Sequence, residues 1–214
     1  MINIKGLIVG GGEFLDEELV MDLINDCDII IAADGGGKYL YDINVLPDIL
    51  VGDFDTLNPF ILNYYKDTNI TIYSFPPEKD KTDLELAIDC ALDNHIDELK
   101  LIGVLGTRID HSLGNIMLLF NLIEKGIDAR IINDKNEIFV VNKEMIITKN
   151  RFEYVSILPI LEDLKGIKLK GFEYDIDDLN LKISSTRGIS NKLVNDKGII
   201  KIKSGKGLII LSKD

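Results

Sequence analysis

Two hydrophobic patterns follow one another along the chain. Up to about residue 140, short apolar runs alternate with segments whose apolar residues recur at helical spacing, as at Leu84, Ala87, Ile88 and Ala91. Strands that alternate with helices are typical of a mostly parallel sheet covered on both faces. The predicted strands are Lys5–Val9, Asp28–Ala33, Asp48–Val51, Asn69–Phe75, Leu99–Val104 and Ala129–Ile132, and the predicted helices are Phe14–Asn25, Thr82–Asn94 and His111–Lys125.

Beyond about residue 140 the helical period disappears. Short β-type runs take over, and Gly, Asn and Asp separate them, as in a small antiparallel sandwich. We therefore expect an α/β fold with an N-terminal, mostly parallel α/β sheet domain (1–142) followed by a small C-terminal antiparallel β-sandwich domain (143–214). The predicted strands here are Met145–Thr148, Phe152–Leu158, Ile167–Lys170, Leu181–Ser184, Gly198–Lys203 and Gly207–Leu211.

Charge separates the same two regions. The 214 residues carry a net charge of −12, but residues 1–142 have a net charge of −16 and residues 143–214 a net charge of +4. So acidic a chain argues against a broad nucleic-acid interface, and no apolar run approaches the roughly 20 residues of a membrane span. The chain starts without a signal-peptide pattern, and its two cysteines, Cys27 and Cys90, form no CxxC motif. We expect reduced thiols and a cytoplasmic protein.

Candidate chemistry follows the predicted strands. The carboxyl ends of parallel strands share one edge of a sheet, where ligands of open α/β folds bind. Five motifs are expected at this edge, and their coincidence there is more informative than any one of them. They are Gly10-Gly11-Gly12, Asp34-Gly35-Gly36-Gly37, Gly52-Asp53-Phe54-Asp55, Lys79-Asp80-Lys81-Thr82-Asp83 and Gly106-Thr107-Arg108-Ile109-Asp110-His111.

The carboxylates in these motifs favour a metal site. In an extended segment, Asp53 and Asp55 would point to the same side and repel each other unless a cation lies between them. Mg²⁺ fits, since it binds through one or two carboxylates together with substrate phosphates. The alternative is a turn whose aspartates accept backbone N–H bonds. Asp34 and Asp83, expected at the same edge, favour the metal.

Two motifs open helices and have structural explanations of their own. Thr82 and Glu85 have the spacing of a capping box, and Asp83 in the first turn would be stabilised by the helix dipole. A helix start can equally receive phosphate. Arg108 is suited to phosphate oxygens, whereas Asp110 could either cap the next helix or bind metal or nucleotide. A histidine at a helix start is more often a structural hydrogen-bonding residue than a catalyst, and a catalytic role for His111 is the alternative.

Read together, the motifs resemble those of the thiamine pyrophosphokinase family. The resemblance covers nearly the whole chain. It rests on five short stretches in order, and their combination is specific although each is weak. They are Ala33-Asp34-Gly35-Gly36, Pro47-Asp48 with Gly52-Asp53-Phe54-Asp55-Thr56, Lys79-Asp80-Lys81-Thr82-Asp83, Gly103 through Arg108-Ile109-Asp110-His111 with Asn115, and Ser185-Thr186-Arg187-Gly188-Ile189-Ser190-Asn191.

The resemblance implies an activity and a set of site residues. Family members have an α/β catalytic domain and a C-terminal β-sandwich, form homodimers with composite active sites, and transfer pyrophosphate from ATP to the hydroxyethyl oxygen of thiamine with Mg²⁺, releasing AMP. Carried over by motif, the catalytic residues are Asp53, Asp55, Asp83, Arg108 and Asp110, with Asp53, Asp55 and Asp83 as metal ligands. The nucleotide- and thiamine-binding residues are Asp34, Gly35, Asp80, Thr82, Arg108, Asp110, His111, Asn115, Ser190 and Asn191.

The sequence departs from the family pattern in places, and other functions remain open. Thr56, Thr107 and Gly114 stand where the family more usually has serine, glycine and alanine, and the chain has no tryptophan to stack on the pyrimidine, which leaves Tyr174 as the candidate ring. A metal-dependent nucleotide-sugar transferase would explain Asp53 and Asp55 but gives the C-terminal motif no role. A non-catalytic thiamine or nucleotide sensor would retain the fold.

Overall fold

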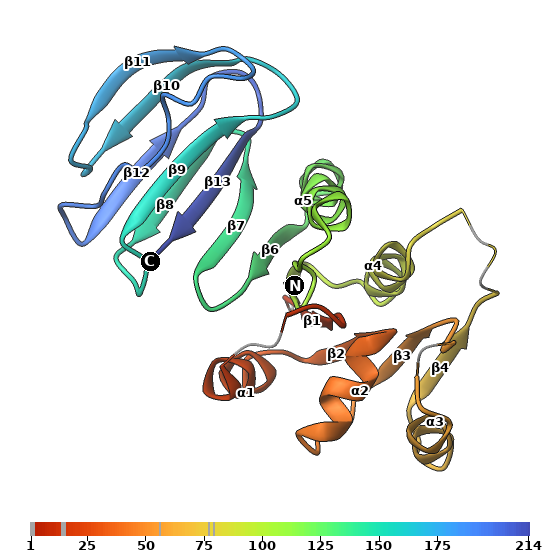
Figure 1. Cartoon of the computed structure of the whole chain (residues 1–214). Coiled ribbons are helices and arrows are strands. Elements are labelled where there is room, and N and C mark those ends of the chain that lie inside the picture. Colours follow the sequence, from red (N-terminus) through yellow and green to blue (C-terminus); the bar gives the residue numbers. More distant parts are fainter. Residues whose placement is uncertain (1–2, 14–15, 56, 77, 79) are drawn as a thin grey trace. The chain divides into compact units, whose positions relative to one another are not determined.

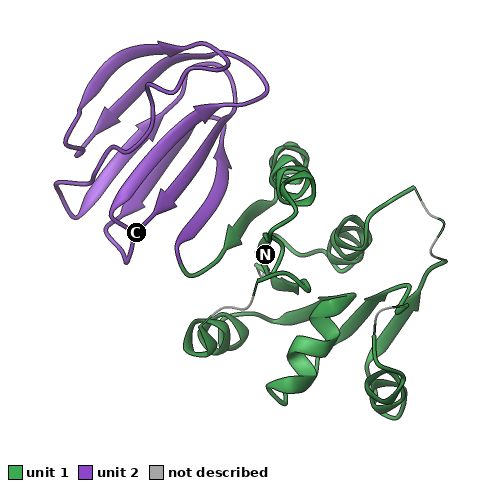
Figure 2. Cartoon of the chain, viewed as in Figure 1, with its two compact units in different colours: residues 1–134 green, residues 135–214 purple. Residues whose placement is uncertain are grey.

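The chain folds into two compact units, residues 1–134 and 135–214 (Figure 2). The computed structural model describes residues 3–13, 16–55, 57–76, 78 and 80–214. The compact units divide after Asp134, whereas the composition changes after residue 142. The segment between these points contains strand β7 (Asn136–Val141), which pairs with β13 (Gly207–Ser212) of the second unit.

Parallel strands form the sheet of unit 1. Within its described residues, six strands lie in the order β4-β3-β2-β1-β5-β6, and every neighbouring pair is parallel. Helices α1, α2 and α3 cover one face and α4 and α5 cover the other (Figure 1). The elements are β1 (Lys5–Val9), α1 (Glu17–Asn25), β2 (Ile29–Ala33), α2 (Gly35–Asp42), β3 (Ile49–Gly52), α3 (Pro59–Lys66), β4 (Thr71–Ser74), α4 (Asp83–Asp93), β5 (Glu98–Ile102), α5 (Ile109–Glu124) and β6 (Asp128–Ile132).

The connections of this sheet create a natural ligand crevice. From β1 the chain continues through α1 to β2 on one side, and from β5 it continues through α5 to β6 on the other. Strands β1 and β5 are neighbours, so the loops that leave their carboxyl ends diverge to opposite faces of the sheet. Such a topological switch point is where open α/β sheets bind ligands.

The apolar runs predicted as strands lie in the core of this unit. Leu7, Ile31 and Leu50 are completely buried, because helices cover both faces and central strands of a parallel sheet have no solvent side. Helices α2 and α3 were not predicted. Helix α2 begins with the glycines 35–37, which are poor helix formers, and α3 begins at Pro59, where proline is tolerated because the first N–H has no partner in a helix.

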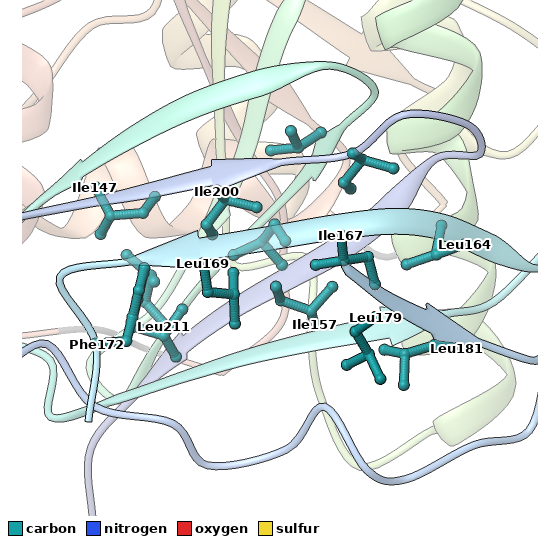
Figure 3. Close-up of a cluster of buried hydrophobic side chains, with 14 of the residues drawn as sticks. Ile147, Ile157, Leu164, Ile167, Leu169, Phe172, Leu179, Leu181, Ile200 and Leu211 are labelled. Atoms are coloured by element: carbon teal, nitrogen blue, oxygen red, sulfur yellow. The ribbon is translucent and has the colours of Figure 1, made fainter. Parts of the chain in front are cut away.

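Unit 2 is an antiparallel β-sandwich, as expected. Within this unit, strands β7, β13 and β9 are neighbours in that order on one side of the sandwich, and the sheet β11-β10-β12-β8 forms the other. Side chains from both sides, among them Ile157 and Ile200, share one core (Figure 3). The predicted strand Leu181–Ser184 is wrong, because β11 ends at Leu181 and Ser184 has a left-handed φ of 71°. The remaining strands are β8 (Glu144–Thr148), β9 (Tyr154–Pro159), β10 (Leu164–Lys170), β11 (Ile176–Leu181) and β12 (Lys197–Lys201).

Two further expectations concern the whole chain. Cys27 and Cys90 are free thiols, and burial raises the pKa of Cys27 to about 11. None of the helices in the described ranges combines the length and apolar character that a membrane span requires. The helix expected at Phe14–Asn25 is observed from Glu17, and Phe14 and Leu15 lie outside the described residues, as do Thr56 and Lys79 of the predicted motifs.

Candidate active site

A cavity of about 510 Å³ lies at the carboxyl ends of β1, β2 and β5 in unit 1. This is the switch point identified from the strand order, and the volume is in the range of small-molecule sites. Backbone and side chains from five segments line it: Gly10-Gly11-Gly12, Ala33-Asp34-Gly35, Thr82-Asp83-Leu84, Gly103 to Arg108, and His111 with Asn115.

Glycines allow the walls of this cavity to meet. A Cβ on Gly36 would lie 1.9 Å from the carbonyl oxygen of Val9, and a Cβ on Gly11 would lie 2.8 Å from the Cα of Gly35. Any side chain at these positions would separate β1 from the start of α2. Close packing of backbone therefore explains these glycines, and it leaves main-chain groups of residues 10–12 on the cavity surface, where phosphates can approach them.

Three helices begin at the cavity, and the positive ends of their dipoles meet there. These are α2 at Gly35, α4 at Asp83 and α5 at Ile109. In the described residues, neither Asp34 nor Arg108 caps its helix through a side-chain hydrogen bond, whereas Thr82 caps α4. The residues at the N-cap positions of α2 and α5 thus leave first-turn N–H groups that an anion such as phosphate can approach, although in α5 the N–H of His111 bonds to the Asp110 carboxylate.

Three carboxylates come together at the ends of β2 and β3. Asp34, Asp53 and Asp55 each place a carboxylate oxygen within 4.8 Å of the other two. Asp34 adopts the unusual backbone angles φ 45° and ψ −111°, which accompany its position between β2 and α2. Such strain in a residue other than glycine marks a position that the surrounding structure holds in place. Three clustered hard oxygen donors fit Mg²⁺ or a similar divalent cation.

Asp53 and Asp55 reach this cluster through a turn, so the expected extended geometry is wrong. Strand β3 ends at Gly52, and Phe54 has a left-handed φ of 60° with its ring buried. The backbone N–H of Asp55 donates to Oδ1 of Asp53 at 3.2 Å. The turn proposed as the alternative explanation is therefore present, and it is also what brings the two carboxylates to Asp34.

The third acidic motif lies at the start of α4. Thr82 and Glu85 form the capping box, with the Thr82 N–H donating to Oε2 of Glu85 at 3.0 Å and the Glu85 N–H donating to Oγ1 of Thr82 at 3.2 Å. Asp83 lines the cavity but lies outside the cluster of three carboxylates, and Asp80 is exposed and does not line the cavity. Asp83 thus faces the ligand space from a helix start.

Arg108 and Asp110 form an ion pair at the start of α5. Nη2 of Arg108 donates to Oδ2 of Asp110 at 2.6 Å and Nε donates to Oδ1 at 3.3 Å, with both side chains about two-thirds exposed (69% and 67%). The hydrogen bond from Arg108 holds the pKa of Asp110 below its usual range. Asp110 lies in the first turn and does not occupy the capping position, which Arg108 holds.

Two polar residues of α5 fix the loop that follows β5. Nδ2 of Asn115 donates to the carbonyl oxygen of Val104 at 2.6 Å, and Oγ of Ser112 bonds both the N–H and the carbonyl of Gly106 at 3.1 Å. Ser112 was not anticipated, because an isolated serine within a helix carries no sequence signal for a loop contact. His111, exposed, lines the cavity one turn from Asn115.

Unit 2 has a cavity of its own, of about 560 Å³, at the edge of the sandwich. Apolar residues of β9, β10 and β11 form its inner wall, and Arg187 and Asn191 come from the C-terminal motif. Glu173, Tyr174 and Asp175 lie at its rim. Of these three residues, the sequence predicted only Tyr174 as part of a ligand site. Two carboxylates beside an aromatic ring suit a flat, cationic ligand.

The two residues expected to face thiamine differ in their surroundings. Asn191 lines this cavity but is buried, and its amide bonds to the main chain of Tyr174 and Lys192. Ser190 is exposed, has a left-handed φ of 62°, and donates its N–H to Oγ of Ser156 at 3.0 Å. The motif therefore has a clear structural role within the sandwich.

Comparison with known proteins agrees with both units. Residues 20–131 match the family described as "Thiamin pyrophosphokinase, catalytic domain", and residues 143–209 match "Thiamin pyrophosphokinase, vitamin B1 binding domain". The thiamine pyrophosphokinase of Bacillus subtilis is 32% identical over 212 residues, which cover 97% of this chain and 98% of the relative.

Solved structures give the same result for the fold. A crystal structure of thiamine pyrophosphokinase from Bacillus subtilis superposes with a TM-score of 0.88 at 31% identity, covering 98% of this chain and 99% of that one. A crystal structure of thiamin pyrophosphokinase from Geobacillus thermodenitrificans superposes with a TM-score of 0.87 at 28% identity, covering 99% of this chain and 98% of that one. The resemblance inferred from the motifs is confirmed, and the chain belongs to the thiamine pyrophosphokinase family.

Proposed function

We propose that the cavity of unit 1 holds the triphosphate of ATP, with Mg²⁺ bound by Asp34, Asp53 and Asp55, and that pyrophosphate passes from ATP to the hydroxyethyl oxygen of thiamine. The family supplies the activity and its two substrates, ATP and thiamine. The observation that carries the residue assignment is the cluster of three carboxylates within 4.8 Å of one another. One of them, Asp34, lines the cavity, whereas Asp53 and Asp55 join it from beyond the lining residues. When bound there, Mg²⁺ would neutralise charge on the phosphates.

The residues of the chain perform the rest of the work by positioning. The alcohol oxygen of thiamine attacks the β-phosphorus, the bond from that phosphorus to the oxygen of the α-phosphate breaks, AMP leaves, and the alcohol proton passes to a carboxylate. Arg108 and the starts of α2 and α5 hold the phosphate oxygens. Asp83 faces the same space, so it remains our candidate for a second metal contact or for the proton acceptor.

A product assay tests this directly. ATP, thiamine and Mg²⁺ are incubated with the protein, and nucleotides are separated by anion-exchange chromatography. Thiamine-dependent formation of AMP is expected, and removal of Mg²⁺ with EDTA is expected to stop it. Formation of ADP, or AMP release that does not require thiamine, would contradict the proposal. The nucleotide-sugar transferase and the non-catalytic sensor are not favoured by the family assignment.

We further propose a homodimer in which each active site uses residues of both subunits. The support is electrostatic, because residues 1–142 carry a net charge of −16 and residues 143–214 one of +4, and oppositely charged surfaces favour association. A location in the cytoplasm stays a prediction.

Subunit exchange tests the shared site. Asp53→Asn and Asn191→Ala proteins are mixed at thiamine well below KM, where each alone is nearly inactive. Random exchange makes about half of the dimers mixed, each with one intact site, so about a quarter of wild-type activity is expected. No recovery, with exchange verified by native mass spectrometry, would refute the shared site and leave the activity assignment intact.

A further inference from the structure

The rim of the unit 2 cavity depends on an unusual bond pattern around Asn191. Oδ1 of Asn191 accepts from the backbone N–H of Tyr174 at 3.1 Å, and Nδ2 donates to the carbonyl oxygen of Tyr174 at 3.0 Å. Oδ1 also accepts from the N–H of Lys192 at 2.9 Å. One side-chain amide thus binds both polar groups of the Tyr174 main chain.

The backbone of Asn191 is anchored in a different element. Its carbonyl accepts from the N–H of Val155 at 2.7 Å, and its own N–H donates to the carbonyl of Val155 at 3.0 Å, which ties it to β9. On the other side, the loop 172–174 pairs with residues 192–193 through a bridge between Phe172 and Leu193 and the bond from Glu173 N–H to the Lys192 carbonyl. The main chain of Asn191 is already used by β9, so only its side chain can continue this pairing to Tyr174.

We propose that Asn191 is a positioning residue, which fixes the main chain of Tyr174 so that the tyrosine ring forms one wall of the thiamine subsite. The proposal rests on the function proposed above. Tyr174 is 64% exposed although it is large and aromatic, while Phe172, two residues earlier, is 3% exposed and anchors the same loop in the core. The loop is therefore held at both ends, with the Tyr174 ring left at the cavity rim.

The chemistry of the rim fits this ligand. Glu173 and Asp175 lie on either side of Tyr174 and line the same cavity as Arg187. Asp175 accepts the Phe172 N–H at 3.0 Å and lies 3.9 Å from Nζ of Lys170, so an aromatic cation would find a ring to stack on and negative charge mainly from Glu173.

The side-chain amide of Asn191 carries its donor and its acceptor on separate atoms, which lets it bond the N–H and the carbonyl of Tyr174 together. A serine hydroxyl can also donate and accept, but from a single oxygen one bond nearer the main chain, so Asn191→Ser is expected to lose at least one of the two bonds. An ionised aspartate would set a carboxylate against the Tyr174 carbonyl.

A tryptophan reporter makes the loop visible without catalysis. The chain has no tryptophan, so Tyr174→Trp introduces a single fluorophore at the rim. In this background, Asn191→Ser is expected to lower the fluorescence anisotropy of the tryptophan and to weaken thiamine binding about tenfold, since the loss of one or two hydrogen bonds releases the loop. Asn191→Asp, which keeps the size of the side chain, is the second variant if the serine protein does not fold.

Asn180 gives the matched control. Its Oδ1 also accepts a backbone N–H in unit 2, from Gly166 at 2.9 Å, but it does not line the cavity. Asn180→Ser is expected to leave anisotropy and thiamine affinity unchanged. An Asn191 variant that keeps wild-type anisotropy while folded would overturn the proposal.

Enzyme kinetics separate positioning from direct contact. In the tyrosine-containing protein, Asn191→Ser is expected to raise the KM for thiamine about tenfold while changing the KM for ATP and kcat less than twofold. In a Tyr174→Ala background, the same change is expected to raise the KM for thiamine less than twofold further, because there is no longer a ring to position. A full tenfold loss in that background would show that Asn191 contacts thiamine itself and would overturn the inference. The anisotropy requires no substrate, so it can fail or succeed independently of the AMP assay.

Discussion

Replacement of Asp55 by asparagine is expected to stabilise the metal-free protein and to weaken its response to Mg²⁺. Asp55 is exposed, and its carboxylate lies within 4.8 Å of those of Asp34 and Asp53. Asparagine has nearly the same size and removes only the charge. The turn is kept, because the bond that closes it comes from the backbone N–H of Asp55 to Asp53.

The size of the effect follows from Coulomb's law. Two unit charges at the observed upper separation of 4.8 Å repel by about 0.9 kcal/mol in water, and salt near 0.1 M reduces this to roughly half. Asp55 takes part in two such pairs, so about 1 kcal/mol of repulsion disappears on substitution. For a chain of this size that corresponds to an increase in Tm of about 2–4 °C.

Thermal unfolding followed by circular dichroism, in EDTA and across a titration with Mg²⁺, provides the assay. The wild-type Tm should rise with Mg²⁺, since a ligand of the folded state stabilises it by mass action. The Tm of the Asp55→Asn protein should be higher than the wild-type Tm in EDTA and should rise less with Mg²⁺, so that the two plots of Tm against Mg²⁺ concentration cross. Asp22→Asn, which removes an exposed charge on α1 outside the cluster, is the control and should run parallel to wild type.

The opposite result would refute the reasoning. If the carboxylates only build the turn, Asp55→Asn should retain the wild-type shift of Tm with Mg²⁺, because the turn bond uses the backbone N–H of Asp55 and the side chain of Asp53. That outcome would remove the metal assignment of all three residues. It would leave the family assignment and the product assay untouched.

Three further predictions test other parts of the molecule. Asp83→Asn should keep the Tm within a few degrees, since asparagine supports a helix start, but lose activity in the AMP assay; retained activity would reduce Asp83 to a helix-start residue. Gly36→Ala should destabilise by several kcal/mol in urea unfolding because its Cβ would lie 1.9 Å from the Val9 carbonyl, whereas Gly114→Ala on α5, with open space around it, should stabilise by up to about 1 kcal/mol. Hydrogen bonds from Lys100 and Lys5 lower the pKa of Asp26, which is 47% exposed, to about 2. Asp26→Asn should therefore lower the free energy of unfolding at pH 7 by about 0.5–1 kcal/mol. The difference in stability between wild type and variant should disappear as the pH falls from about 4 towards 2.

The sequence pattern was sufficient for the sheet of unit 1 because parallel strands are buried on both faces. Continuous apolar runs such as Ile29–Ala33 have no other stable environment in a chain of this composition. The local pattern did not predict α2, because its first three residues are glycines, which disfavour a helix. The helix forms because only glycine permits its start to pack on the end of β1, which is a tertiary contact that a local pattern does not record.

The site was partly predictable for a related reason. Strand order places the carboxyl ends of β1, β2 and β5 together, so motifs that follow these strands had to meet. Which atoms meet depends on backbone conformations that spacing does not reveal. The left-handed angles of Asp34 and Phe54 bring one carboxylate cluster together, and the side chain of Asn191 turns inward to a neighbouring loop where its motif had indicated a ligand contact.

The charges at the switch point are divided in a way that suits a metal–triphosphate. Carboxylates gather after β2 and β3, while Arg108 and the start of α5 lie after β5. Arg108 is paired with Asp110, but both side chains are largely exposed, and exposed ion pairs contribute little. A phosphate that carries more charge than one carboxylate can therefore displace Asp110 without a large penalty. The pair keeps the guanidinium near the cavity, so if ATP binds there as we propose, Arg108 would exchange one partner for another without a search for a new side-chain position.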